Sequence, residues 1–101
     1  MATTAYLTHP DCLLHRNPGE HPEHPDRLRA IEAGLKASGL WERLSHSDVP
    51  FATREQLTRA HQADYVDLVE AAVPENGFNH LSFDAGLCAH TWDAARRAAG
   101  A

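Results

Sequence analysis

The sequence predicts a small, mostly helical domain that begins with a β-strand. Residues 3–8 form a short β-prone run, and residues 26–38 carry apolar side chains at helical spacing. Helical spacing returns in residues 54–73 and again near the end of the chain. A sheet with one or two strands is not stable alone, so we expect residues 1–101 to form a single, incomplete domain.

Composition and charge exclude several classes of function. The chain has 101 residues, 43% of them hydrophobic and 23% charged, which is typical of one globular domain. Nine basic residues against fourteen acidic ones give a net charge of −5, which argues against a nucleic-acid partner. No apolar run approaches the ~20 residues of a membrane span. The two cysteines and the lack of a secretory signal predict a cytoplasmic protein with reduced thiols.

The first helix has the clearest sequence signals. Pro25 and Asp26 suit a first helical turn, and Gly39 suits the stop at the other end. Glu32 and Lys36 have the spacing of a surface ion pair. Leu28, Ile31 and Leu35 follow one another at helical spacing and form one apolar stripe.

The middle of the chain predicts a weak edge strand and then a broken helix. Residues 45–51 are β-prone, although a proline near the end of the run weakens the strand. Thr53 and Gln56 fit a capping box at the start of a helix. Helical spacing then continues to Val73, with a break near His61.

The remaining segments predict loops and a last helix. The region from His9 to Pro25 has no period and predicts a structured loop. Residues 74–77 predict a turn, residues 81–84 are too short a run to assign, and residues 90–101 predict a helix. Aromatic side chains at helical positions are expected in the core, namely those of Trp41, Tyr65 and Trp92.

One segment carries a family motif. Residues 21–28 read His-Pro-Glu-His-Pro-Asp-Arg-Leu, which resembles the signature near the N-terminus of histone deacetylase-like amidohydrolases. That family also includes acetylpolyamine amidohydrolases and acetoin-utilisation deacetylases. The likeness continues in order: residues 55–66 resemble the family's Glu-x-Leu, His and Tyr-Val helix, and residues 94–100 resemble its Ala-rich helix ending in Gly.

The resemblance implies both a fold and a chemistry. The fold would be α/β, the N-terminal portion of an arginase/deacetylase-type fold in which helices flank a parallel sheet. The chemistry would be hydrolysis of acetylated lysine or polyamine-type substrates, in which zinc activates water and a His-His pair and a Tyr assist. The sequence contains no His-His, Asp-x-His or Gly-Gly-Tyr motif. We therefore expect zinc in the full-length enzyme, and neither catalytic residues nor bound zinc in this chain alone.

The resemblance also assigns roles to individual side chains. Arg27 matches an arginine that lines a product channel and interacts with released acetate, which suits a guanidinium; its alternative role is to tie the loop to backbone carbonyls. Asp84 falls near the family's rim aspartate, which accepts backbone N–H groups of the substrate, with helix capping as the alternative. Many relatives have Thr after this Asp, where this chain has Ala85. The entrance-loop signature consists of His21, Pro22 and Glu23.

Other polar residues have two interpretations each. Four of the eight histidines lie between His9 and His24, and with Cys12 they offer ligand types that zinc uses. Their spacings match no zinc finger, so we interpret the cluster as structural, with zinc binding as the alternative. His61 and Asp64 suggest a catalytic pair, but a histidine at a helix break is the simpler reading. Neither Cys12 nor Cys88 has the sequence context of a reactive thiol.

Two functions from different classes fit these observations. The first is the N-terminal part of a zinc-dependent deacetylase-like amidohydrolase, and the second is a non-catalytic interaction module that retains the start of this fold. If the chain is the start of a larger domain, its apolar stripes have only part of their partner surface. We therefore expect self-association through exposed apolar side chains.

Overall fold

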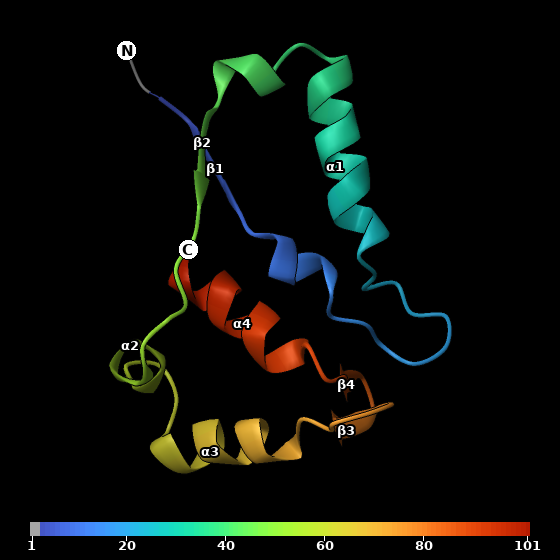
Figure 1. The fold of residues 1–101 in the computed structure, drawn as a ribbon, viewed down its shortest axis with the longest axis vertical. Helices are drawn as coiled ribbons and strands as arrows, with labels where there is room; N and C mark the ends of the chain where they lie inside the picture. Colours follow the sequence, from blue (N-terminus) through green and yellow to red (C-terminus); the bar gives the residue numbers. More distant parts are fainter. Residues whose placement is uncertain (1–2) are drawn as a thin grey trace.

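The structure is a computed structural model that describes residues 3–101. It is a flat molecule with extents of 43 × 33 × 19 Å (Figure 1). The helices and strands are, in chain order, β1 (Ala5–Thr8), the 3₁₀ helix η1 (Pro10–Leu13), α1 (Asp26–Ala37), the 3₁₀ helix η2 (Trp41–Arg43), β2 (Ser45–Asp48), α2 (Arg54–Thr58), α3 (Ala63–Ala72), β3 (Asn79–Ser82), β4 (Ala85–Leu87) and α4 (Thr91–Gly100).

The predicted α/β fold is confirmed by the first half of the chain. β1 and β2 pair in parallel, with Ala5 opposite Ser45, and α1 lies between them in sequence. The Tyr6 hydroxyl donates to Glu32 at 3.0 Å and fastens α1 to the sheet. The Lys36 ammonium lies 4.7 Å from the centre of the Trp41 ring. The predicted ion pair between Glu32 and Lys36 is therefore wrong, because each side chain takes another partner.

Local signals place the helix ends where the sequence predicts them. Gly39 has φ +78°, a conformation that glycine adopts without strain, and α1 stops just before it. The capping box is present: the Thr53 hydroxyl accepts the Gln56 N–H at 3.2 Å, and the Gln56 side chain accepts the Thr53 N–H at 2.9 Å. The helix then breaks between α2 and α3, around His61.

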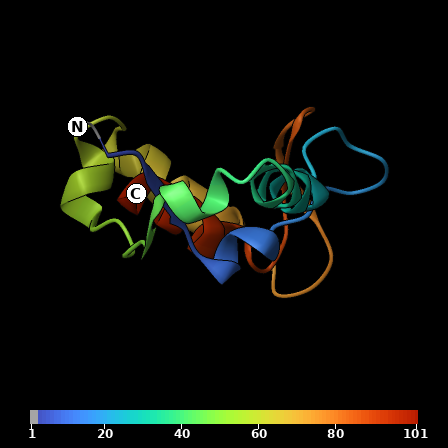
Figure 2. The ribbon, with the colours of Figure 1, turned by 90° about the horizontal axis from the view of Figure 1, so that it is seen from above.

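The β3–β4 hairpin is an element that the sequence did not predict. β3 and β4 are antiparallel, and the hairpin turn carries Phe83, which is fully exposed. The hairpin lies beside the entrance loop, which we define as residues 14–25 (Figures 1 and 2). Gly86 is where the two segments meet, because a Cβ added there would lie 2.7 Å from Asn17 Oδ1.

The core among the described residues is small. Its buried apolar side chains are short or medium in size, and Tyr65 is 44% exposed, so the predicted core position of Tyr65 is wrong. Trp41 and Trp92 are half-buried. Within residues 3–101 no helix is long and apolar enough to cross a membrane. The buried apolar residues are Val49, Ala52, Val66, Leu87 and Cys88.

Candidate functional site

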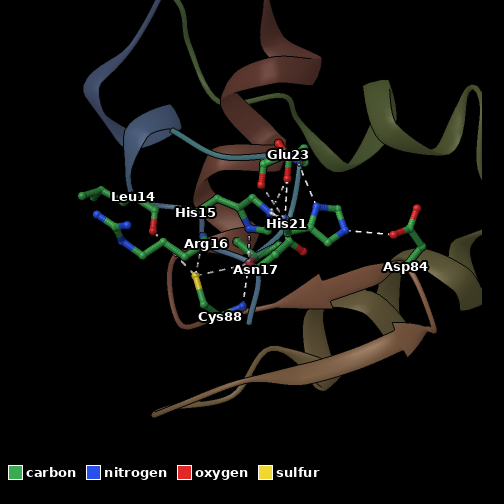
Figure 3. Close-up of polar contacts among 9 residues, drawn as sticks. Leu14, His15, Arg16, Asn17, His21, Glu23, Asp84 and Cys88 are labelled. Atoms are coloured by element: carbon green, nitrogen blue, oxygen red, sulfur yellow. Dashed lines mark hydrogen bonds and ion pairs between the residues drawn. The ribbon is translucent and has the colours of Figure 1, made fainter. Parts of the chain in front are cut away.

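Two of the predicted site residues are in contact. Asp84 lies in the turn between β3 and β4, and His21 lies in the entrance loop 63 positions earlier. His21 Nε2 is 2.9 Å from Asp84 Oδ1, and Figure 3 shows the ring edge facing the carboxylate. The following helix, α4, begins only at Thr91. Helix capping, the alternative role for Asp84, is therefore wrong.

The sequence His-Pro-acid occurs three times in the described chain and forms the same small turn each time. In each, the ring Nδ1 accepts the backbone N–H of the acidic residue two positions later, at 3.0–3.1 Å. Proline has no N–H, so the acidic residue supplies the first available donor. An Nδ1 that accepts a hydrogen bond leaves the proton of the neutral ring on Nε2. The three histidines are His9, His21 and His24.

Glu23 holds the entrance loop together. Its carboxylate accepts a hydrogen bond from Asn17 Nδ2 at 2.7 Å and lies 3.1 Å from His15 Nε2. The other nitrogen of His15, Nδ1, is 2.8 Å from the hydroxyl of Thr91 in the first turn of α4. Pro22 lies exposed between His21 and Glu23. The signature therefore ties the loop both to the hairpin and to α4.

Cys88, for which the sequence predicted no reactive role, is a further polar centre. Its Sγ accepts hydrogen bonds from the Arg16 N–H at 3.3 Å and the Thr91 hydroxyl at 3.5 Å, and lies 3.6 Å from the Leu14 carbonyl oxygen (Figure 3). Burial raises the pKa of the Cys88 thiol, but hydrogen bonds from Thr91 and from backbone N–H groups outweigh it, and the net pKa is lowered. The Arg16 donor lies 72 positions from Cys88, so no local pattern predicts it, whereas Thr91 is only three residues away.

Arg27 lies on the first turn of α1, beside a small cavity. The cavity has a volume of about 110 Å³, and Arg27, His15 and His24 are among its lining residues. Arg27 is exposed, and within residues 3–101 its guanidinium donates to no backbone carbonyl. The alternative role, tying the loop to carbonyls, is therefore not what the side chain does here. The position beside a cavity is compatible with the channel role, which stays a prediction.

The remaining candidate residues are the histidine cluster and the pair His61 and Asp64. In the part of the chain that the structure describes, no group of three or more His, Cys, Asp or Glu side chains is arranged to hold a metal ion. In the three His-Pro-acid turns the Nδ1 atoms already accept backbone N–H groups. The ring of His61 lies 5.7 Å from that of Tyr65, in the break between α2 and α3.

Comparisons with known proteins show which family this chain resembles. Residues 21–101 match the sequence profile of the histone deacetylase domain. The chain is 34% identical over 80 residues to the histone deacetylase-like amidohydrolase of Pseudomonas aeruginosa. It is 33% identical over 81 residues to histone deacetylase 15 of Arabidopsis thaliana. Each alignment covers 79% of this chain, but only 21% of the first relative and 14% of the second.

The fold has a solved counterpart. The crystal structure of the HDA15 HD domain matches 98% of this chain with a TM-score of 0.82 at 28% identity, and the match covers 30% of that domain's chain. Fold and sequence together define an amidohydrolase-type α/β segment. The chain belongs to the histone deacetylase family, as its motifs predicted. It spans 30% or less of the length of these relatives.

Proposed function

We propose that this chain is the N-terminal part of a zinc-dependent deacetylase-like amidohydrolase that removes acyl groups from acetyl-lysine or small acetylated amines. The chain itself contributes substrate and product contacts rather than the hydrolytic groups. Family membership over residues 21–101 supports the class of reaction. The observation that carries the assignment to this part of the enzyme is the contact between Asp84 and the signature residue His21.

Asp84 is suited to bind the peptide backbone of a substrate. Its side chain is 83% exposed on a turn, and one oxygen already has a donor in His21. A carboxylate offers about four acceptor sites, so capacity remains for N–H groups of a substrate. In the proposal Asp84 accepts these N–H groups beside the acyl-lysine side chain.

Arg27 is suited to receive a small carboxylate product. Its guanidinium is always charged and presents donors in a planar fork that matches a carboxylate. The adjoining cavity of about 110 Å³ leaves space for a molecule of the size of acetate. In the proposal Arg27 interacts with acetate after the amide bond has been cleaved.

Zinc does not fit the described residues of this chain. A catalytic zinc site needs three protein ligands and an open position, and within residues 3–101 no group of three such side chains is suitably arranged. In the proposal the metal and the proton-transfer groups come from another part of the enzyme. The chain alone is expected to show no turnover of acetyl-lysine peptides, even with added zinc.

A hybrid enzyme tests this proposal. Residues 3–101 would replace the structurally matching segment of the HDA15 HD domain, which we call the HD hybrid, and the unmodified HD domain would be its control. The expected result is zinc-dependent release of acetate from an acetyl-lysine peptide, abolished by a chelator. A hybrid that folds like its parent but releases no acetate would contradict the proposal. That outcome would favour the non-catalytic interaction module.

A further inference from the structure

Asp84 is an exposed carboxylate of which one oxygen is held by the protein. A side chain that is 83% exposed on a short turn samples several rotamers when nothing holds it. Here His21 Nε2 lies 2.9 Å from Oδ1. Oδ1 is thereby fixed, and Oδ2 stays available for an incoming donor. The direction in which Oδ2 points depends on His21.

His21 is itself held in one orientation. Its Nδ1 accepts the Glu23 N–H at 3.0 Å, and its side chain is only 20% exposed. Glu23 is anchored in turn by Asn17 and His15. The direction of the His21 Nε2–H bond is therefore set by the entrance loop and not by solvent.

We propose that His21 is a positioning residue for substrate binding: it donates Nε2–H to Asp84 Oδ1 and so directs Oδ2 toward a backbone N–H of an acyl-lysine peptide. The inference rests on the proposed function, and it adds a role in binding to a signature residue that otherwise only shapes the loop. Because Nδ1 is occupied as an acceptor, His21 is a neutral donor. Asp84 thus keeps its negative charge for the substrate, and charge-assisted hydrogen bonds are the stronger kind.

The chain contains a matched control for this role. His9 makes the same local turn, accepting the Asp11 N–H at Nδ1 over 3.1 Å, but it neither contacts Asp84 nor lines the cavity beside Arg27. His9→Ala therefore removes a His-Pro-acid turn and leaves the Asp84 contact in place. A variant effect that comes only from loss of such a turn would appear at both histidines.

The contact is tested first in the 101-residue chain itself. Long-range ¹H–¹⁵N spectra should show His21 as the Nε2–H tautomer, and Asp84→Ala should shift the His21 Nε2 resonance but not that of His24. A His21 ring protonated on Nδ1, or a His21 resonance that Asp84→Ala leaves unchanged, would overturn the inference. This readout does not depend on any activity.

The consequence for binding is tested in the HD hybrid. We expect His21→Ala to raise KM for an acetyl-lysine peptide by about 3- to 10-fold and to leave kcat unchanged, because a single hydrogen bond orients the acceptor. Adding His21→Ala to Asp84→Ala should have no further effect, since His21 acts through Asp84. His21→Gln, which keeps an N–H donor, should recover part of the affinity, and His9→Ala should change nothing.

The outcomes separate this inference from the proposed function. If Asp84→Ala raises KM and His21→Ala does not, the positioning role is overturned and the proposed function stands. If the two effects add, His21 acts independently of Asp84 and the inference is again overturned. If neither variant changes KM in an active hybrid, the substrate role of Asp84 fails, and the inference fails with it.

Discussion

Arg97 donates from Nε to Asp11 Oδ2 at 3.0 Å, although the two residues lie 86 positions apart. Arg97 Nη1 also donates to the Val49 carbonyl at 2.9 Å, and the guanidinium lies 3.5 Å from the centre of the Phe51 ring. One side chain therefore joins α4 to η1 and to the segment that follows β2. Its 17% exposure means that these contacts are largely removed from water.

Replacement of Arg97 by lysine should destabilise the fold although the charge is kept. An ammonium cannot make both hydrogen bonds of the planar fork and cover the Phe51 ring at the same time. Loss of one charge-assisted hydrogen bond corresponds to about 1–3 kcal/mol, measured as the free energy of unfolding in urea. Arg59→Lys is the control, because its pair with Glu55 is exposed, and a change of about 0.5 kcal/mol or less is expected there. Equal effects at both positions would contradict the anchoring role.

Gly100 should not tolerate a side chain. A Cβ added at Gly100 would overlap the backbone carbonyl oxygen of Pro50, and backbone cannot rotate away as a side chain can. Overpacking of this kind costs about 1–3 kcal/mol, so Gly100→Ala should lower the melting temperature. Gly34 on α1 is the matched control, because a Cβ there meets nothing within 4 Å. Gly34→Ala should stabilise the chain by about 0.5–1 kcal/mol through helix propensity.

A comparison of Gly100 with the helix ends shows which features of the fold the sequence alone predicts. The capping box at Thr53 and the stop at Gly39 rest on hydrogen bonds between residues three to five positions apart, and the structure has both. The closeness of Gly100 to Pro50 is a contact between distant segments, and no period or propensity encodes it. The family motif identified Gly100 as part of an Ala-rich helix ending in Gly, but the reason for glycine becomes visible only in the packing.

In the candidate site, too, the sequence predicted some features and missed others. The motif predicted His21 and Asp84 separately, each from its place in the family pattern, and the structure brings them to 2.9 Å. The β3–β4 hairpin that carries Asp84 was missed because its strands are four and three residues long and mostly polar or small. Strands of that length form because tertiary contacts stabilise them, here those between Gly86 and the entrance loop.

The ion pair between Arg54 and Asp67 should make the stability of the fold depend on pH in the acidic range. A hydrogen bond from Arg54 at 2.6 Å lowers the pKa of the Asp67 carboxyl below its ordinary value. A carboxyl with a lowered pKa in the folded state stabilises above its unfolded pKa, and this stabilisation is lost as pH falls through the folded pKa. In Arg54→Gln the ¹³C titration of Asp67 should move upward to its ordinary range. Arg59→Gln breaks a different exposed pair and should leave the Asp67 titration unchanged.

The Cys88 thiol should titrate according to its Thr91 partner. Burial raises its pKa, but hydrogen bonds from the Thr91 hydroxyl and backbone N–H groups lower the pKa by more than burial raises it. In a Cys12→Ser background, Thr91→Val should therefore raise the pKa read from the Cys88 ¹³Cβ shift, whereas Thr91→Ser should not. A thiol whose pKa is lowered in the folded state stabilises the fold more and more as pH rises through that pKa. Thr91→Val should therefore reduce this increase in the stability of the fold. An identical titration in both variants would rule out the hydroxyl as the cause.

The exposed apolar side chains should make the isolated chain associate. Ile31 is 48% exposed and Leu68 is 57% exposed, whereas a fully buried side chain of this size contributes about 1.5–3 kcal/mol. Between α3 and α4 lies an apolar groove of about 290 Å³, and Phe83 stands fully exposed on the hairpin turn. Light scattering after size exclusion should show a mass that grows with concentration. Leu68→Lys and Phe83→Ser should reduce the association without lowering the melting temperature, because neither side chain is buried. A monomer at all concentrations with a sharp, cooperative melt would show instead that the chain is a self-sufficient unit.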